Sequence, residues 1–173
     1  MDENLRKRFD QLQVGRSGVL AEITAWTPGQ LQYRPAETCW SAIEVIDHLT
    51  KVERAAVALI EESLVCPHSI TFENRVKTVL VNLVMRSPLR VKVPTVVSHV
   101  LPSSELTLRD VAAEWEQVRL EMKQTLEAAP IERVGVFKHP VAGWMTLPQA
   151  MAFLHAHLIH HRYQINRLKR LNS

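Results

Sequence analysis

The sequence contains few of the residues that build turn-rich or nucleotide-binding folds, with only 5 glycines among 173 residues. It has no G-x-G-x-x-G segment and no P-loop pattern, so a glycine-lined phosphate site is not expected. The two cysteines, Cys39 and Cys66, form neither a disulfide framework nor a C-x-x-C motif. Because free cysteine is usually buried, we expect two free, buried thiols.

Long apolar runs and strong net charge are also missing. The longest apolar stretch, residues 76–85, is interrupted by Lys77 and Asn82 and is too short to cross a bilayer. The charged start of the chain, residues 1–8, lacks an apolar export core, which predicts a cytoplasmic protein. The formal net charge is +3 and no basic stripe with interleaved aromatic residues occurs. We therefore expect neither nucleic-acid nor membrane binding.

Apolar residues recur at helical spacing through most of the chain. This periodicity predicts four long helices and one shorter helix, at about residues 3–26, 39–66, 72–85, 107–129 and 147–171. Thr107 and Asp110 form an imperfect capping box at one helix start, and Pro148 is tolerated in the first turn of the last helix. Residues 30–38 and 135–146 are expected to be loops, and residues 91–97 an extended crossover.

Four long helices with one long crossover between the second and the third indicate an all-α fold, a four-helix bundle of the up-down-down-up type. No internal repeat suggests a second domain, so residues 1–173 are expected to form a single domain. The short helix at 72–85 is more apolar than a connecting segment needs, and such a surface tends to form contacts. We expect it either to cover the bundle or to join two subunits. Its apolar residues are Val76, Val79, Leu80, Leu83 and Val84.

Three histidines are the candidates for chemistry. His157 and His161 are four residues apart in the last predicted helix, which places their rings one above the other on one face. His161 falls inside the apolar stripe of that helix and His157 lies at its edge. His48 lies on the flank of the apolar face of the second helix. A buried imidazole needs a polar partner. Either a shared metal ion or an ordinary hydrogen bond within the core could provide that partner for these histidines.

A third imidazole from His48 would complete a three-nitrogen metal site with a position open for water or substrate. Such ligands suit zinc, nickel, copper or iron, and the sequence does not choose among them. Glu44 and Asp47 could orient His48 or a bound water, although a solvated position is the simpler expectation for Asp47. His139 could reach the mouth of a cleft, although local packing in a loop is the simpler expectation. The remaining weak candidates are also expected in loops: His68 and His99.

These segments together resemble the DinB-like superfamily, the metal-binding four-helix proteins that include the YfiT-type hydrolases. The resemblance covers about residues 15–170 and implies that His48, His157 and His161 bind one divalent metal ion, zinc or nickel, in a homodimer. The resembling pieces, in order, are Trp40-Ser41, Glu44, Asp47-His48-Leu49, His139-Pro140, Gly143, His157-x-x-x-His161 and Gln164-Ile165.

The same superfamily includes mycothiol-dependent isomerases and bacillithiol transferases. The resemblance therefore implies a thiol S-transferase or a hydrolase that acts on a small molecule, since a bound cation lowers the pKa of water or of a thiol. Transfer from a low-molecular-weight thiol is slightly favoured, because Glu44 and His160 are the only candidates for catalytic proton transfer. The alternatives are a non-catalytic metal-binding stress or interaction protein, and a bundle whose histidines are only core residues.

Overall fold

The computed structural model describes residues 1–66, 68–88, 100–101, 106–129 and 134–171. Within them the chain is mostly helical, as the periodicity predicts, with one small antiparallel sheet. The expected crossover at 91–97 lies outside the described residues. In chain order the elements are α1 (Glu3–Ile23), α2 (Pro28–Gln32), α3 (Ala42–Val65), α4 (Phe72–Met85), α5 (Leu108–Ala128), β1 (Phe137–His139), β2 (Gly143–Met145) and α6 (Leu147–Leu171).

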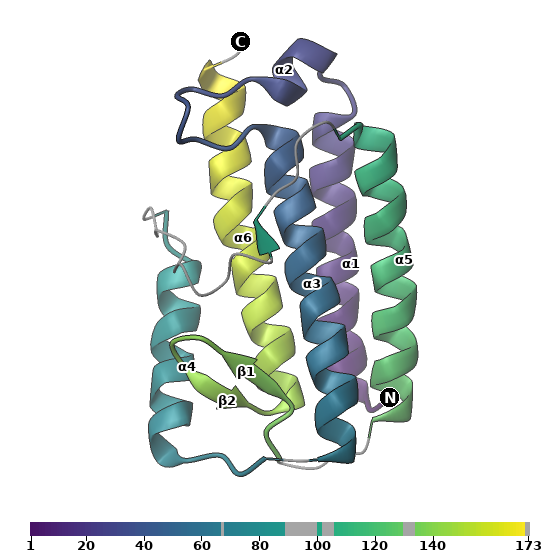
Figure 1. The fold of residues 1–173 in the computed structure, drawn as a ribbon, viewed down its shortest axis with the longest axis vertical. Coiled ribbons are helices and arrows are strands. Elements are labelled where there is room, and N and C mark those ends of the chain that lie inside the picture. Colours follow the sequence, from purple (N-terminus) through teal and green to yellow (C-terminus); the bar gives the residue numbers. More distant parts are fainter. Residues whose placement is uncertain (67, 89–99, 102–105, 130–133, 172–173) are drawn as a thin grey trace.

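Four long helices, α1, α3, α5 and α6, lie side by side, with α1 and α6 running in one direction and α3 and α5 in the other (Figure 1). α6 packs against α1 and α3, and α3 also packs against α5. α4 lies outside these four helices, against α6 and the hairpin strand β2 (Figure 1). One face of α6 is therefore turned toward α3, and this contact positions the candidate site.

Local sequence signals explain where the helices begin. Ser41 caps α3, because its hydroxyl accepts a hydrogen bond from the amide of Glu44 while the Glu44 carboxylate accepts one from the amide of Ser41. Thr107 caps α5 by accepting a hydrogen bond from the amide of Asp110, as predicted. The bounds predicted for the helices at 72–85 and 147–171 are confirmed.

Two predicted loops contain short regular elements, so those predictions are wrong in part. α1 ends at Ile23 rather than near residue 26, because Thr27 begins the short helix α2 through a capping box with Gln30. Within the predicted loop 135–146, β1 and β2 pair as a hairpin, with Phe137 opposite Met145. Strands of three residues are too short to show a periodicity in the sequence.

Gly143 allows the hairpin to pack against α4. Its φ of 72° lies in the left-handed region, which favours glycine. A Cβ at this position would lie 2.4 Å from Nδ2 of Asn74 on α4. The same Nδ2 donates a hydrogen bond to the carbonyl of Ala142 at 3.2 Å. The hairpin turn is thereby fixed to α4 by a contact that a larger residue would break.

A buried ion pair joins α3 to α5. Nε and Nη2 of Arg119 donate to the two carboxylate oxygens of Glu53 at 2.5 and 2.7 Å, and the side chains are 0% and 2% exposed. Nε1 of Trp115 donates to the same carboxylate at 2.9 Å. Nη1 of Arg119 also donates to Gln13 on α1 at 3.2 Å. This polar network joins α3 to α5 within the core.

α4 packs against the rest of the protein with only one of its sides. It contacts α6 and β2, but most of its apolar side chains point away from these contacts. None of the described helices has the length and apolar character that a membrane crossing needs. The exposed apolar residues of α4, here called the α4 face, are Phe72, Val76, Val79, Leu80, Leu83 and Val84.

Candidate metal centre

The structure brings His48 of α3 together with His157 and His161 of α6. Nε2 of His157 lies 3.3 Å from Nε2 of His48 and 3.1 Å from Nε2 of His161. One candidate ligand atom from each ring lies within 4.8 Å of the others. Two nitrogens bound to a tetrahedral zinc ion at about 2.0–2.1 Å are roughly 3.3–3.4 Å apart. Two of the three nitrogen–nitrogen distances are therefore close to those between ligands of a single ion, and the third pair, His48 and His161, lies within 4.8 Å.

Hydrogen bonds on the far side of two rings fix their orientation. Nδ1 of His48 donates to the carbonyl of Val100 at 2.7 Å, since a carbonyl only accepts. Nδ1 of His161 lies 3.0 Å from Oε1 of Gln164, to which it donates. A neutral imidazole with its proton on Nδ1 carries a lone pair on Nε2. Both rings therefore direct an Nε2 lone pair toward the same point, as metal-binding histidines do.

A metal ion would provide a partner for all three Nε2 atoms, whereas hydrogen bonds among the rings cannot. With the protons of His48 and His161 on Nδ1, a proton on Nε2 of His157 can align with only one of the two neighbouring lone pairs. A buried polar atom without a partner costs about 1–3 kcal/mol. One shared cation would bind all three lone pairs, so the donor set fits a metal ion better than it fits hydrogen bonding.

Burial keeps the three rings neutral. His48, His157 and His161 are 3%, 8% and 5% exposed. Burial lowers the pKa of His157 and of His161 well below the ordinary value of 6.5, and neighbouring imidazoles lower both further. Burial also lowers the pKa of His48, against the opposite effect of its hydrogen bond to the backbone of Val100. Because only neutral imidazole binds a cation, the rings remain available as ligands somewhat below pH 6.5.

Aromatic side chains pack against the ligands. The Trp40 ring, just before α3, lies 4.8 Å from the His48 ring and 6.2 Å from the His161 ring. Phe153 stacks on His157 at 5.6 Å. The sequence alone does not assign these roles to Trp40 and Phe153, or a role to Gln164. The available signal was spacing on α6, since Phe153 precedes His157 by four residues and Gln164 follows His161 by three.

The Glu44 carboxylate lies one turn before His48 but is occupied by other partners. Its Oε2 accepts hydrogen bonds from Nε of Arg34 and from the amide of Ser41, both at 2.8 Å. Its Oε1 accepts from Nη2 of Arg34. Glu44 therefore caps α3 and binds Arg34, and proton transfer by Glu44 would require these bonds to change. Its catalytic role stays a prediction.

His160 lies beside the three ligands but on another side of α6. Its ring is 5.3 Å from that of His161, edge to face, and is buried. Burial lowers the pKa of His160, against the opposite effect of a hydrogen bond to the backbone of Ser87. Its Nδ1 is buried and has no hydrogen-bond partner within the part of the chain that the structure describes. The proton-transfer role of His160 stays a prediction.

His139 ends β1 and packs beside the ligands rather than among them. Its Nδ1 accepts hydrogen bonds from the amides of Val141 and Ala142, both at 3.1 Å. Burial lowers the pKa of His139 to about 4. Its ring meets that of Phe153 at 4.6 Å, edge to face. His139 is thus buried beside the centre, where sequence analysis favoured simple packing in a loop.

One other candidate histidine, His68, packs away from the centre. His68 stacks on Trp144 at 3.7 Å and pairs with Gly135 through backbone hydrogen bonds. This packing agrees with the loop position expected for it. His99 lies outside the described residues.

Three expectations about exposure are wrong. Asp47, expected in solvent, is 2% exposed, and its carboxylate pairs with Lys51 at 3.0 Å. Cys66, expected to be buried, is exposed, because it is the C-cap residue where α3 ends. Cys39 is partly exposed in the segment before α3. Residue type alone did not predict these positions, since each depends on how the ends of α3 pack.

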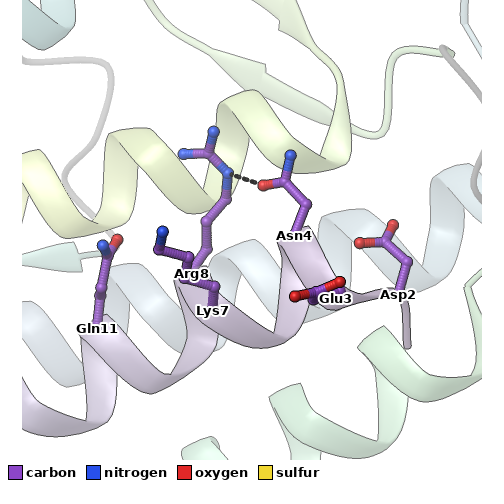
Figure 2. A pocket seen from close by; sticks show the side chains of 6 residues that line it. All are labelled: Asp2, Glu3, Asn4, Lys7, Arg8 and Gln11. Atoms are coloured by element: carbon purple, nitrogen blue, oxygen red, sulfur yellow. Dashed lines mark hydrogen bonds between the residues drawn. The ribbon is translucent and has the colours of Figure 1, made fainter.

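A separate hollow lies beside the start of α1 (Figure 2). Two of the lining residues are joined, because Nε of Arg8 donates to Oδ1 of Asn4, one turn earlier on α1, at 2.8 Å. Its lining contains side chains of both charges and none of the three histidines, so it is distinct from the candidate metal centre. The lining residues are Asp2, Glu3, Asn4, Lys7, Arg8 and Gln11.

Comparison with known proteins identifies the family of the chain. A family model described as the DinB superfamily matches residues 11–165. The matched span contains all three histidines and the hairpin, and it confirms the resemblance inferred from the sequence. No curated protein and no solved structure gave a match. The chain belongs to the DinB superfamily.

Proposed function

We propose that this chain is a cytoplasmic metal-dependent enzyme that acts on a small molecule, as a thiol S-transferase or as a hydrolase. The observation that carries the proposal is the approach of three buried Nε2 atoms from α3 and α6, at 3.1 and 3.3 Å. Membership of the DinB superfamily supports a metal-binding role. In this proposal the four long helices form an up-down-down-up bundle around the centre.

His48, His157 and His161 would hold one divalent transition-metal ion, zinc or nickel. When bound, such an ion lowers the pKa of water or of a thiol and supplies a nucleophile near neutral pH. Three protein nitrogens leave a fourth position for that molecule. The chain contributes orientation, because the Val100 carbonyl and Gln164 hold two of the rings with Nε2 facing inward.

Thiol transfer fits the surroundings of the centre better than hydrolysis. Hydrolysis needs a base or acid that moves protons between water and the leaving group. Glu44, the carboxylate that the sequence offers for this role, is bound by Arg34 and by the Ser41 amide. A thiol needs less help, because it ionises more readily than water. We therefore favour a low-molecular-weight thiol as one substrate.

A non-catalytic metal-binding stress or interaction protein is the second candidate. Burial of all three rings favours it, since a closed site would bind the ion for stability alone. The two candidates differ in whether an added small molecule reaches the ion. Binding of a thiol to the metal-loaded protein would exclude the closed site.

We also propose that the protein is a homodimer that buries the α4 face. Exposed apolar surface of this kind is typical of protein–protein contacts. The face lies on the side of α4 opposite its contacts with α6 and β2, so a second copy could cover it without disturbing the bundle.

Metal content is the direct test of the proposed function. Purified protein loaded with zinc or nickel and then dialysed should retain about one ion per chain by mass spectrometry. The variant with His48, His157 and His161 all replaced by alanine should retain none. His155→Ala is the matched control, because His155 lies on α6 outside the cluster, and it should retain the ion. Equal metal content in the triple variant and the parent would refute the assignment.

Activity is the second part of the test. The metal-loaded protein should consume one of a panel of small thiols in the presence of electrophiles, and the triple alanine variant should not. Hydrolysis of ester or amide substrates without thiol would select the hydrolase instead. Metal retention with neither reaction would favour the non-catalytic candidate.

A further inference from the structure

His139 is a buried ring with an unused hydrogen-bond donor. It is 9% exposed and stands where β1 enters the hairpin turn. Because its Nδ1 accepts two backbone hydrogen bonds, this atom carries the lone pair and the ring proton is on Nε2. None of the described residues accepts a hydrogen bond from that Nε2. The ring also keeps a small exposed surface, which an acceptor oxygen of a ligand could reach.

The ring lies close to the candidate metal centre. His139 contacts Phe153 at 4.6 Å, and Phe153 in turn stacks on the ligand His157 at 5.6 Å. Burial lowers the pKa of His157 most, and of the four imidazoles that lower it further His139 has the smallest effect, which agrees with a ring beside the centre rather than within it. The hairpin that carries His139 packs against α3 and α4. His139 therefore approaches from an element that supplies none of the three ligands.

We infer that His139 is a positioning residue whose Nε2–H donates a hydrogen bond to a carboxylate or carbonyl oxygen of the small molecule bound at the three-histidine centre. This inference rests on the proposed function and adds a substrate class, a molecule with an acceptor oxygen near the group that meets the metal. The two amides on Nδ1 prevent the ring from turning its lone pair outward. A fixed donor discriminates against molecules that present another donor at that point.

Two thiols that differ in the acceptor provide the test. Mercaptoacetate carries a carboxylate beside its thiol, whereas ethanethiol carries none. Their affinities for the zinc-loaded protein are measured by calorimetry, for the parent and for His139→Asn. Asparagine is chosen because its side-chain oxygen can accept the same two turn amides but places no donor at the position of Nε2. Zinc content and melting temperature are measured first, to establish that the variant is folded and loaded.

We expect His139→Asn to bind mercaptoacetate about tenfold more weakly and ethanethiol as the parent does, since a hydrogen bond to a charged group contributes about that factor. Equal mercaptoacetate affinity in the variant and the parent would overturn the inference. The ring would then serve only the hairpin turn, with its Nε2–H directed at Phe153. A parent that binds no zinc would refute the proposed function, and this inference with it, at the earlier step.

A measurement on the unmutated protein covers the case in which His139→Asn does not fold. In protein labelled with ¹⁵N at histidine, the His139 resonances should show a proton on Nε2 and none on Nδ1. Added mercaptoacetate should shift the Nε2–H resonance of the zinc-loaded protein, and ethanethiol should not. A proton on Nδ1, or the same spectrum with and without mercaptoacetate, would overturn the inference.

Discussion

Replacing Arg119 by methionine should destabilise the fold strongly. Methionine keeps much of the apolar length of the side chain but removes the guanidinium that binds both oxygens of Glu53. The carboxylate is 2% exposed and would keep the Trp115 indole as its one partner from the described residues. Removing one member of a buried ion pair costs about 3–5 kcal/mol, because the remaining charge is left without water or a counter-ion.

The double variant Glu53→Leu/Arg119→Met should be much less destabilised than the single variant. It removes both charges, and replacing a whole buried pair by apolar residues of similar volume is often neutral or stabilising by about 1–4 kcal/mol. The indole N–H of Trp115 would lose its acceptor, which costs about 1–3 kcal/mol. These two effects are of similar size and opposite sign. We therefore expect the free energy of unfolding to lie within about 2 kcal/mol of the parent value.

Urea unfolding at pH 7 measures these differences, with the melting temperature as a second readout. For a chain of this size, 3–5 kcal/mol corresponds to a fall in melting temperature of roughly 6–20 °C. Arg54→Met is the matched control, because Arg54 also joins α3 to α5 but is 44% exposed, and it should change stability by less than about 1 kcal/mol. The reasoning would be refuted by an Arg119→Met variant as stable as this control, or by a double variant as unstable as the single one.

Three further predictions concern the centre and the assembly. Without metal, the free energy of unfolding should fall as the pH drops below about 6.5, because the unfolded chain then takes up protons that buried His157 and His161, with lowered pKa values, do not. Urea titrations in chelator between pH 7.5 and 5 measure this, and a flat profile would contradict it. His161→Ala should weaken zinc binding at least about tenfold in a chelator competition, since two nitrogens hold the ion poorly. Unchanged affinity would exclude His161 as a ligand. Leu80→Glu should convert a dimer into a monomer by light scattering, because it places a charge on the α4 face. A monomeric parent at micromolar concentration would remove the dimer proposal.

Short-range signals account for what the sequence predicted correctly. The bounds of α4 and α6 follow from apolar recurrence and nearby prolines, and the start of α5 from Thr107 and Asp110. The four-residue spacing of His157 and His161 places both rings on one face of any α-helix. Each of these features depends on neighbours within a few residues. They could therefore be read without knowing which helices pack together.

The hairpin and α2 were missed for different reasons. Thr27, Pro28 and Gln30 do carry a helix-start signal, but a proline and a glycine directly after α1 are equally typical of a helix end, and α2 has only five residues. β1 and β2 carry no usable signal, because three residues cannot show alternation and the hairpin is held by packing against α3 and α4. Such contacts join residues far apart in the chain, which periodicity does not report.

The amino-acid order alone dictates a mostly helical chain with two histidines on one face of its last helix, because both follow from local backbone geometry. The third histidine and the hydrogen bonds that orient the rings depend on how the helices pack. His48 meets His157 across 109 residues of sequence, and its Nδ1 is held by the Val100 carbonyl 52 residues away. Packing also buries Asp47, occupies Glu44 with Arg34, and leaves the α4 face exposed. Burial, tautomer and hydrogen-bond partner are properties of the assembled contacts, so they become defined only when distant segments come together.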